Sequence, residues 1–303
     1  MLKTKILITF LLTALVFTGT IRAQGQVSAV KHESSIDVRI NGNFFTSYIF
    51  SDTEKYPFFY PVNGPSGASV TSMRNSPYPH HSSLFFGCDE VNGGNYWQEG
   101  LERGQIISLR AEIKENDGQQ VVIENECIWT RQGASAPIKD LRRITISAPS
   151  EDVYQVDFDI TLQMLQDVVI EKTNHSLFSA RMDPDLAVIN GGTMINAEGQ
   201  QTEDGTWGEP SPWIDYYGQR GDKTEGLAIL QHPSNSWYPS PWFTRDYGFF
   251  SPTPMYWPED GESRAFEKGE NIKLHYRVLV HSGDHESAGI AEHFEAYKSE
   301  EKQ

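Results

Sequence analysis

The chain has 303 residues, with 25 Lys and Arg against 41 Asp and Glu, so its formal net charge is −16. This length accommodates one large domain or two small ones with a substantial core. An acidic surface repels nucleic acid and anionic lipid, which excludes both as expected partners.

Residues 1–23 have the pattern of an export signal. Lys3 and Lys5 precede the apolar run Ile6–Phe17, and small and polar residues follow as far as Ala23. A membrane anchor is the alternative, but a run of 12 residues is too short to span a bilayer. We therefore expect cleavage after Ala23, a periplasmic or secreted mature protein with 22 basic against 41 acidic residues, and no integral membrane association.

Strand patterns dominate the rest of the chain. Runs rich in β-branched and aromatic residues alternate with turn signals, among them Asn41-Gly42 and Asn116-Asp117-Gly118. These patterns predict strands over Ile36–Ile40, Phe44–Phe50, Gln105–Lys114, Gln120–Thr130, Leu141–Ala148, Val153–Met164, Val168–Lys172 with a continuation near Phe178, Leu227–Gln231 and Ile272–His281.

Helical periodicity is convincing only near the C-terminus. Ile290, Ala291, Phe294 and Tyr297 form an apolar stripe, and Asp284 is placed to cap a helix over about residues 285–299. Many strands and one late helix predict a mainly β fold, a large antiparallel β-sandwich or barrel, formed as a single domain over residues 24–303.

The chain has two cysteines, Cys88 and Cys127. In an oxidising compartment they could form a disulfide. Each lies among apolar residues, so two buried free thiols are an equal alternative.

The densest group of chemically active side chains lies between Tyr78 and Trp97. It contains the adjacent pairs His80-His81 and Asp89-Glu90 and the amide of Asn92. Neighbouring side chains on a strand point to opposite faces, so only one of each pair enters a pocket unless the chain bends. We take His81 as the candidate catalyst and His80 as its support. One carboxylate is expected to support the next turn and the other to meet a histidine; the alternative is an ordered loop without a ligand.

A second group lies 150 residues later and interleaves aromatic with polar side chains: His232, Asn235, Trp242, Arg245, Asp246 and Tyr247. Planar aromatic rings pack against the C–H faces of a sugar while polar groups bind its hydroxyls, so this composition predicts a carbohydrate cleft. A packed aromatic lid is the alternative. Trp207 belongs to a third patch of the same kind, and Arg181 is expected to bind a carboxylate or a leaving oxygen, or to pair with Asp183.

Three segments carry a resemblance to a known family: Tyr78–Trp97, Thr206–Gly218 and Gly226–Pro254. They resemble the family labelled "methane oxygenase PmoA-like", whose members are similar to galactose-mutarotase-like β-supersandwich proteins. In that family a His often precedes the Pro-His-His motif and an Arg follows it, whereas this chain has Tyr78 and Ser82 at these positions.

The resemblance implies a concave sheet that binds a sugar, with a histidine and a carboxylate as acid and base. On this basis the acid is His81 or His232, and the base is Glu90 or Asp246. Binding of substrate, including developing negative charge, is assigned to Arg181, Arg245, His80, Asn92, Trp207, Asn235, Trp242 and Tyr247.

The leading hypothesis is an exported carbohydrate-active enzyme that uses acid–base chemistry for epimerisation, β-elimination or hydrolysis. The first alternative is a non-catalytic carbohydrate-binding protein. The second is a metal-dependent oxygenase, since His80, His81 and Glu90 contain the atoms of a two-His, one-carboxylate iron site. Adjacent His ligands would demand a sharp bend, and no HxD or HExxH spacing is present, so we expect neither a metal nor another cofactor.

Protein purified without a chelator is accordingly expected to contain no bound iron or copper. Elemental analysis by mass spectrometry, on protein expressed in metal-supplemented medium, checks this expectation. One equivalent of either metal per chain would contradict it and favour the oxygenase alternative.

Overall fold

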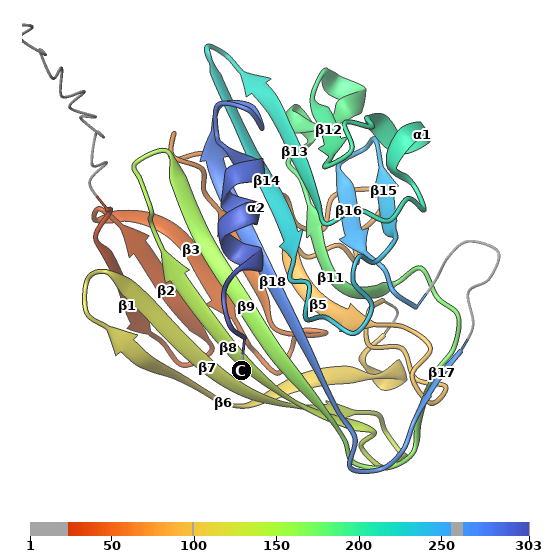
Figure 1. Ribbon diagram of the computed structural model, residues 1–303. Coiled ribbons are helices and arrows are strands. Elements are labelled where there is room, and N and C mark those ends of the chain that lie inside the picture. The colour runs from red at the N-terminus through yellow and green to blue at the C-terminus, as the bar shows by residue number, and fades with distance from the viewer. Residues whose placement is uncertain (1–23, 99, 256–262, 303) are drawn as a thin grey trace, which may run out of the picture.

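Two eight-stranded antiparallel sheets form the body of the protein (Figure 1). This computed structural model describes residues 24–98, 100–255 and 263–302; the expected signal segment lies outside them. Sheet 1 contains, in spatial order, β1 (Val27–Lys31), β2 (Ser35–Ile40), β3 (Asn43–Ile49), β4 (Phe58–Val62), β5 (Leu84–Cys88), β11 (Ser176–Arg181), β16 (Phe249–Pro252) and β15 (Trp242–Arg245). Sheet 2 contains β12 (Thr193–Asn196), β13 (Trp213–Arg220), β14 (Lys223–Gln231), β18 (Asn271–Ser282), β9 (Val153–Met164), β8 (Ile138–Ser147), β7 (Gln120–Thr130) and β6 (Gln105–Asn116).

The remaining elements are short. β10 (Val168–Ile170) pairs with β17 (Arg264–Phe266) in a small separate sheet. The helices are α1 (Thr202–Thr206) and α2 (Ile290–Lys298), with 3-10 turns over Leu101–Arg103, Pro184–Leu186 and Val188–Asn190.

Aromatic side chains join the two sheets. Phe86 of β5 and Phe178 of β11 lie directly opposite each other, so they share the inner face of sheet 1. Their rings contact Phe158 of β9, with centroids 6.0 and 4.9 Å apart, and Phe178 also stacks on Tyr276 of β18 at 5.0 Å. These contacts form the core of a mainly β sandwich, which confirms the predicted fold class.

Local sequence patterns located the long hairpins well. β7 and β9 begin and end at the predicted residues, and Asn41-Gly42 turns between β2 and β3 with left-handed φ angles of 52° and 78°. The strand near Phe178 does not continue β10, however. It forms β11 between β5 and β16, because its pairing partners come from distant segments.

The C-terminal helix is shorter than predicted. Asp284 accepts hydrogen bonds from the Ser287 backbone N–H and hydroxyl at 2.8 and 2.6 Å, so it closes a turn, and α2 begins only after Gly289. Ile290, Phe294 and Tyr297 are buried against Leu230 and Leu279 on the outer face of sheet 2. Ala291, which was expected in the buried stripe, is exposed. In the part of the chain that the structure describes, no helix is long and apolar enough to cross a membrane.

Both cysteines are buried free thiols, Cys88 on β5 and Cys127 on β7. Burial raises the pKa of each thiol well above its usual value. Of the two alternatives for these residues, the structure therefore has the unpaired one.

A fully buried ion pair lies between the sheets. Asp140 and Arg142, two residues apart on β8, form two hydrogen bonds of 2.8 and 3.0 Å, and both side chains have no exposed surface. The Trp129 indole N–H donates to the same carboxylate at 2.8 Å, and the guanidinium lies over the rings of Phe86 and Phe158. The carboxylate therefore compensates a charge that would otherwise be costly in the core.

Asp140→Ala is expected to lower the free energy of unfolding by about 3–5 kcal/mol, because it leaves the Arg142 guanidinium buried without its partner. Urea denaturation measures the loss. Arg143→Ala is the control, because it removes an exposed ion pair on the same strand and should cost less than about 1 kcal/mol. A cost below about 1 kcal/mol for Asp140→Ala would contradict the interpretation.

Candidate functional site

The outer face of sheet 1 carries a cluster of histidines, aromatic rings and one arginine. Because Phe86 and Phe178 point inward, the intervening residues point outward, among them the opposed pair Phe85 and Ser179. Arg181 of β11 and Phe249 of β16 are also directly opposite each other and share this outer face. The backbone N–H of Arg181 donates to the Ser83 carbonyl at 2.7 Å, which brings the preceding histidine segment over the sheet.

His81 is buried in this cluster, with only 4% of its surface exposed. Its ring stacks on Phe249 at 4.4 Å and on Tyr78 at 5.3 Å, and its Nδ1 atom has no hydrogen-bond partner among the described residues. Burial, together with the nearby His80 and Arg181, lowers the pKa of His81 to about 2. The imidazole is therefore neutral at physiological pH.

His80 lies beside His81 instead of pointing away from it. The two rings meet edge to face at 4.4 Å, because the chain here forms turns and not a regular strand. The Tyr56 hydroxyl donates to the His80 carbonyl at 2.9 Å and holds this irregular backbone. Burial and the nearby His175 lower the pKa of His80. Of the two alternatives for this pair, the structure therefore has the one in which the chain bends, and not a regular strand with the histidines on opposite faces.

Asp89 is the carboxylate that meets a histidine. The β5–β11 pairing continues beyond both strands, where the Asp89 N–H donates to the His175 carbonyl at 2.9 Å. The Asp89 carboxylate lies 3.4 Å from His175 Nδ1, and the Gln98 amide contacts both groups at 3.4 and 3.2 Å. The His175 side chain is 27% exposed and close enough to lower the pKa of both His80 and His81. His175 was not predicted from the sequence, because a lone histidine before an apolar strand belongs to no recognisable motif.

Glu90 and Asn92 support the turn instead of the cluster. Glu90 is exposed, and its carbonyl accepts a hydrogen bond from the Glu171 N–H. The Asn92 side chain donates to the Asp167 carbonyl at 3.0 Å and accepts from the Val169 N–H at 2.7 Å. Within residues 24–98, 100–255 and 263–302, no three His, Cys, Asp or Glu side chains are grouped to hold a metal ion.

Arg181 is 5% exposed and packs on an aromatic pair. Its guanidinium lies 4.5 Å from the Tyr247 ring centroid and donates from Nη1 to the Tyr247 carbonyl at 2.7 Å. Tyr247 in turn stacks on Tyr78 at 4.4 Å. Asp183, one of the expected partners of Arg181, pairs with Arg220 instead at 3.2 Å. Burial lowers the pKa of Arg181.

Arg245 and Trp207 lie at the edge of the same face. The Arg245 guanidinium lies 4.2 Å from the Phe243 ring centroid and 5.4 Å from that of Trp207, which is 44% exposed. Glu203 pairs with Arg245 at 2.8 Å and compensates its charge. Asp246, the other expected base, accepts from the Glu203 N–H at 2.7 Å and is thus engaged with α1.

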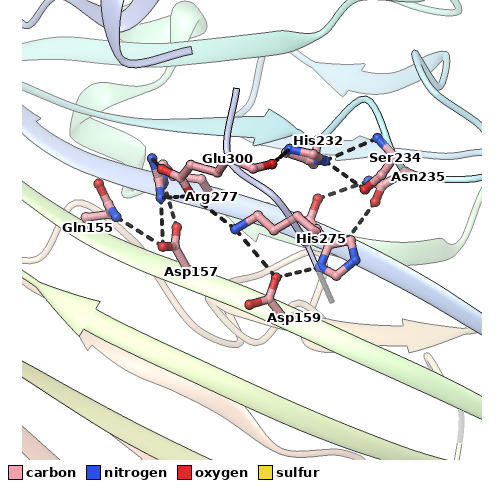
Figure 2. A network of polar contacts seen from close by, with 10 residues as sticks. Gln155, Asp157, Asp159, His232, Ser234, Asn235, His275, Arg277 and Glu300 are labelled. Carbon is pink, nitrogen blue, oxygen red and sulfur yellow. Dashed lines mark hydrogen bonds and ion pairs between the residues drawn. The ribbon is translucent and has the colours of Figure 1, made fainter. Parts of the chain in front are cut away.

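His232 and Asn235 belong to a different region, the outer face of sheet 2 (Figure 2). His232 binds the Ser234 hydroxyl at 2.7 Å and the Glu300 carbonyl at 3.1 Å. The Asn235 side chain forms two hydrogen bonds with the backbone of His275, at 2.7 and 3.0 Å. These contacts include none with the cluster around His81, so the structure does not bring the two expected histidines together.

Trp242 is also part of the framework. It is completely buried on β15, and its indole N–H donates to the Ser211 carbonyl at 2.8 Å. Of the sequence-predicted residues, the structure therefore groups His80, His81, Arg181 and Tyr247, with Arg245 and Trp207 beside them. It places Glu90, Asn92, His232, Asn235, Trp242 and Asp246 in structural contacts.

A hollow of about 960 Å³ lies elsewhere, on the outer face of β6–β9 and β18 in sheet 2. Its lining is charged, and most of its cations have carboxylate partners, for example Lys139 with Glu126 at 2.7 Å and Arg143 with Glu124 at 3.0 Å. Among the described residues, no Phe, Tyr or Trp ring lines it. The His81 cluster combines a buried charge without a carboxylate partner with aromatic rings, and we take it as the candidate site on that chemical ground.

The fold is a β-sandwich, and the cluster of histidine and arginine side chains on the outer face of one sheet is its candidate site. By sequence the chain belongs to DUF6807, a family of unknown function whose model matches residues 35–295. None of the curated proteins matches the sequence.

Two solved structures to which the chain is similar are a polysaccharide lyase and a GH36 α-galactosidase from Geobacillus stearothermophilus. The lyase has 13% identity and a TM-score of 0.36, over 86% of this chain and 33% of that chain. The galactosidase has 8% identity and a TM-score of 0.37, over 86% of this chain and 41% of that chain. The chain spans less than half of either, and likenesses this weak carry no inference about its ligand.

His81→Gln is expected to make the protein less sensitive to acid. The folded pKa of about 2 lies below the unfolded value near 6.5, so protons favour the unfolded chain as pH falls below about 6.5. Removing this group should reduce the slope of unfolding free energy against pH between pH 4 and 6 by up to about 1.4 kcal/mol per pH unit.

Urea denaturation at several pH values measures that slope. His32→Gln is the control, because His32 is exposed near the β1–β2 turn. Equal slopes for His81→Gln and the unmodified protein would show that His81 does not resist protonation.

Proposed function

We propose that the protein is a carbohydrate-active enzyme whose site is the cluster around His81 and whose proton-transfer group is His175. The observation that carries this proposal is the Asp89–His175 pair beside two histidines with lowered pKa. A carboxylate next to Nδ1 can orient an imidazole toward a ligand, as acid–base catalysis requires.

The histidines have different chemical properties. His81, with a pKa of about 2, is not a proton donor near neutral pH. A neutral imidazole can hydrogen-bond a ligand hydroxyl without transferring a proton. His175 is partly exposed and next to a carboxylate, which suits it to exchange protons with a ligand. We therefore assign the acid–base function, expected from the sequence at His81 or His232, to His175.

Aromatic side chains near these groups support the choice of a sugar. Tyr78 and Tyr247 are half-buried, and Trp207 is largely exposed at the edge of the site. Rings of this kind bind the C–H faces of sugars while histidine and arginine bind the hydroxyls. The resemblance to PmoA-like and mutarotase-like proteins favours the same class of ligand, a sugar, and stays a prediction. Export after removal of residues 1–23 also stays a prediction. Epimerisation, β-elimination and hydrolysis all use the proposed proton transfer.

His175→Ala is expected to reduce kcat/KM by about 10²- to 10⁴-fold, the usual contribution of a general acid or base. A screen of reducing sugars and oligosaccharides with the mature protein identifies the substrate for this measurement. His232→Ala is the control, because His232 lies on sheet 2 and should leave turnover close to normal. Circular dichroism establishes that both variants are folded.

Full activity of His175→Ala would overturn the assignment of this residue. Binding of glycans without turnover, with an affinity that is constant between pH 5 and 8, would overturn the enzyme proposal and favour a carbohydrate-binding protein.

A further inference from the structure

We infer that the ligand of this site carries a carboxylate, as a uronic acid does, and that Arg181 binds it. This inference rests on the proposed carbohydrate function and adds the charge of the substrate. It starts from the electrostatics of Arg181, which differ from those of the other buried arginines.

Arg181 is a buried cation with no ion-pair partner among the described residues. Its contacts are the Tyr247 carbonyl, which Nη1 binds, and the face of the Tyr247 ring. Isolated charges are costly in a protein interior and are normally paired. Arg142, by contrast, has Asp140, and Arg277 has Asp157 at 2.6 Å and Glu300 at 2.9 Å.

The carboxylates near Arg181 in sequence and space have other partners. Asp183 pairs with Arg220, Glu203 with Arg245, and Asp246 with the backbone of α1. The adjacent imidazoles offer no negative charge, and His81 is neutral. An anion supplied by the ligand is therefore the group that compensates the Arg181 charge.

The chemistry of the site favours a carboxylate over a phosphate. A planar guanidinium binds a planar carboxylate through two parallel hydrogen bonds. Only Nη1 of Arg181 forms a hydrogen bond with the described residues, so the other nitrogens are free for such contacts. One uncompensated cation matches the single charge of a sugar carboxylate, whereas the phosphate dianion needs a second positive group, and Arg245 is already paired with Glu203.

Isothermal titration calorimetry at pH 7.5 tests the inference with matched ligands: galacturonate and glucuronate, their neutral counterparts galactose and glucose, and galactose 6-phosphate. We expect the mature protein to bind at least one uronate about tenfold or more tighter than its neutral counterpart, as a charge-assisted hydrogen bond implies. Arg181→Met should abolish this preference and Arg181→Lys should retain part of it. Arg143→Met, which removes a paired guanidinium on sheet 2, should keep it.

Equal affinity of the unmodified protein for uronates and neutral sugars would overturn the inference, and so would an unchanged uronate preference in Arg181→Met. Tighter binding of the sugar phosphate than of the uronates would overturn the choice of a carboxylate. The failure of the proposed function can be told apart from the failure of this inference. Uronate binding that depends on Arg181, without any turnover, would reject the enzyme proposal and support the carboxylate site. Turnover of neutral sugars that depends on His175, without a preference for uronates, would support the enzyme proposal and reject the carboxylate site.

Discussion

The pairing of β5 with β11 connects the core of the sandwich to its candidate site. Five residue pairs form this ladder, and alternation gives each strand an inner and an outer face. On the inner face, Phe86 and Phe178 hold the two sheets together. Beyond one end, the ladder sets Asp89 against His175; at the other end it sets the histidine segment against Arg181. A change in the register of this pair would therefore disturb core packing and site geometry together.

Charge compensation separates the candidate site from the rest of the molecule. The buried or half-buried arginines 142, 245 and 277 each have a carboxylate partner. So do the cations Lys139 and Arg143 in the hollow on sheet 2. Arg181 differs from all of these, because its contacts are the ring and the carbonyl group of Tyr247. A buried charge without a partner is costly, and perturbed ionisable groups of this kind cluster at functional sites. The small cluster on sheet 1 is for this reason a better candidate site than the larger hollow.

Long hairpins and the sandwich were predictable because their signals are local. An Asn-Gly turn between alternating strands specifies a hairpin without reference to the rest of the chain, as at β2 and β3. The short strands of the site were harder to find. β15 and β16 lie in an aromatic segment whose periodicity is ambiguous, and β11 owes its position to partners from two distant segments. The same limit applied to the helix: the sequence indicated Asp284 as its cap, but Asp284 closes an earlier turn and α2 begins after Gly289.

The sequence alone determined a mainly β fold and the importance of the segment from Tyr78 to Trp97. It also identified four members of the cluster, His80, His81, Arg181 and Tyr247. Only the tertiary structure decided which groups meet. Asp89 and not Glu90 lies beside a histidine, that histidine is His175 and not His232, and Asp183 pairs with Arg220 and not with Arg181. The physical reason is that residue type and spacing determine which chemical groups are present and to which face of a regular strand each side chain points. Its partners depend on strand pairing between segments far apart in the chain, and in irregular turns such as His80-His81 even the facing is set by the surrounding packing.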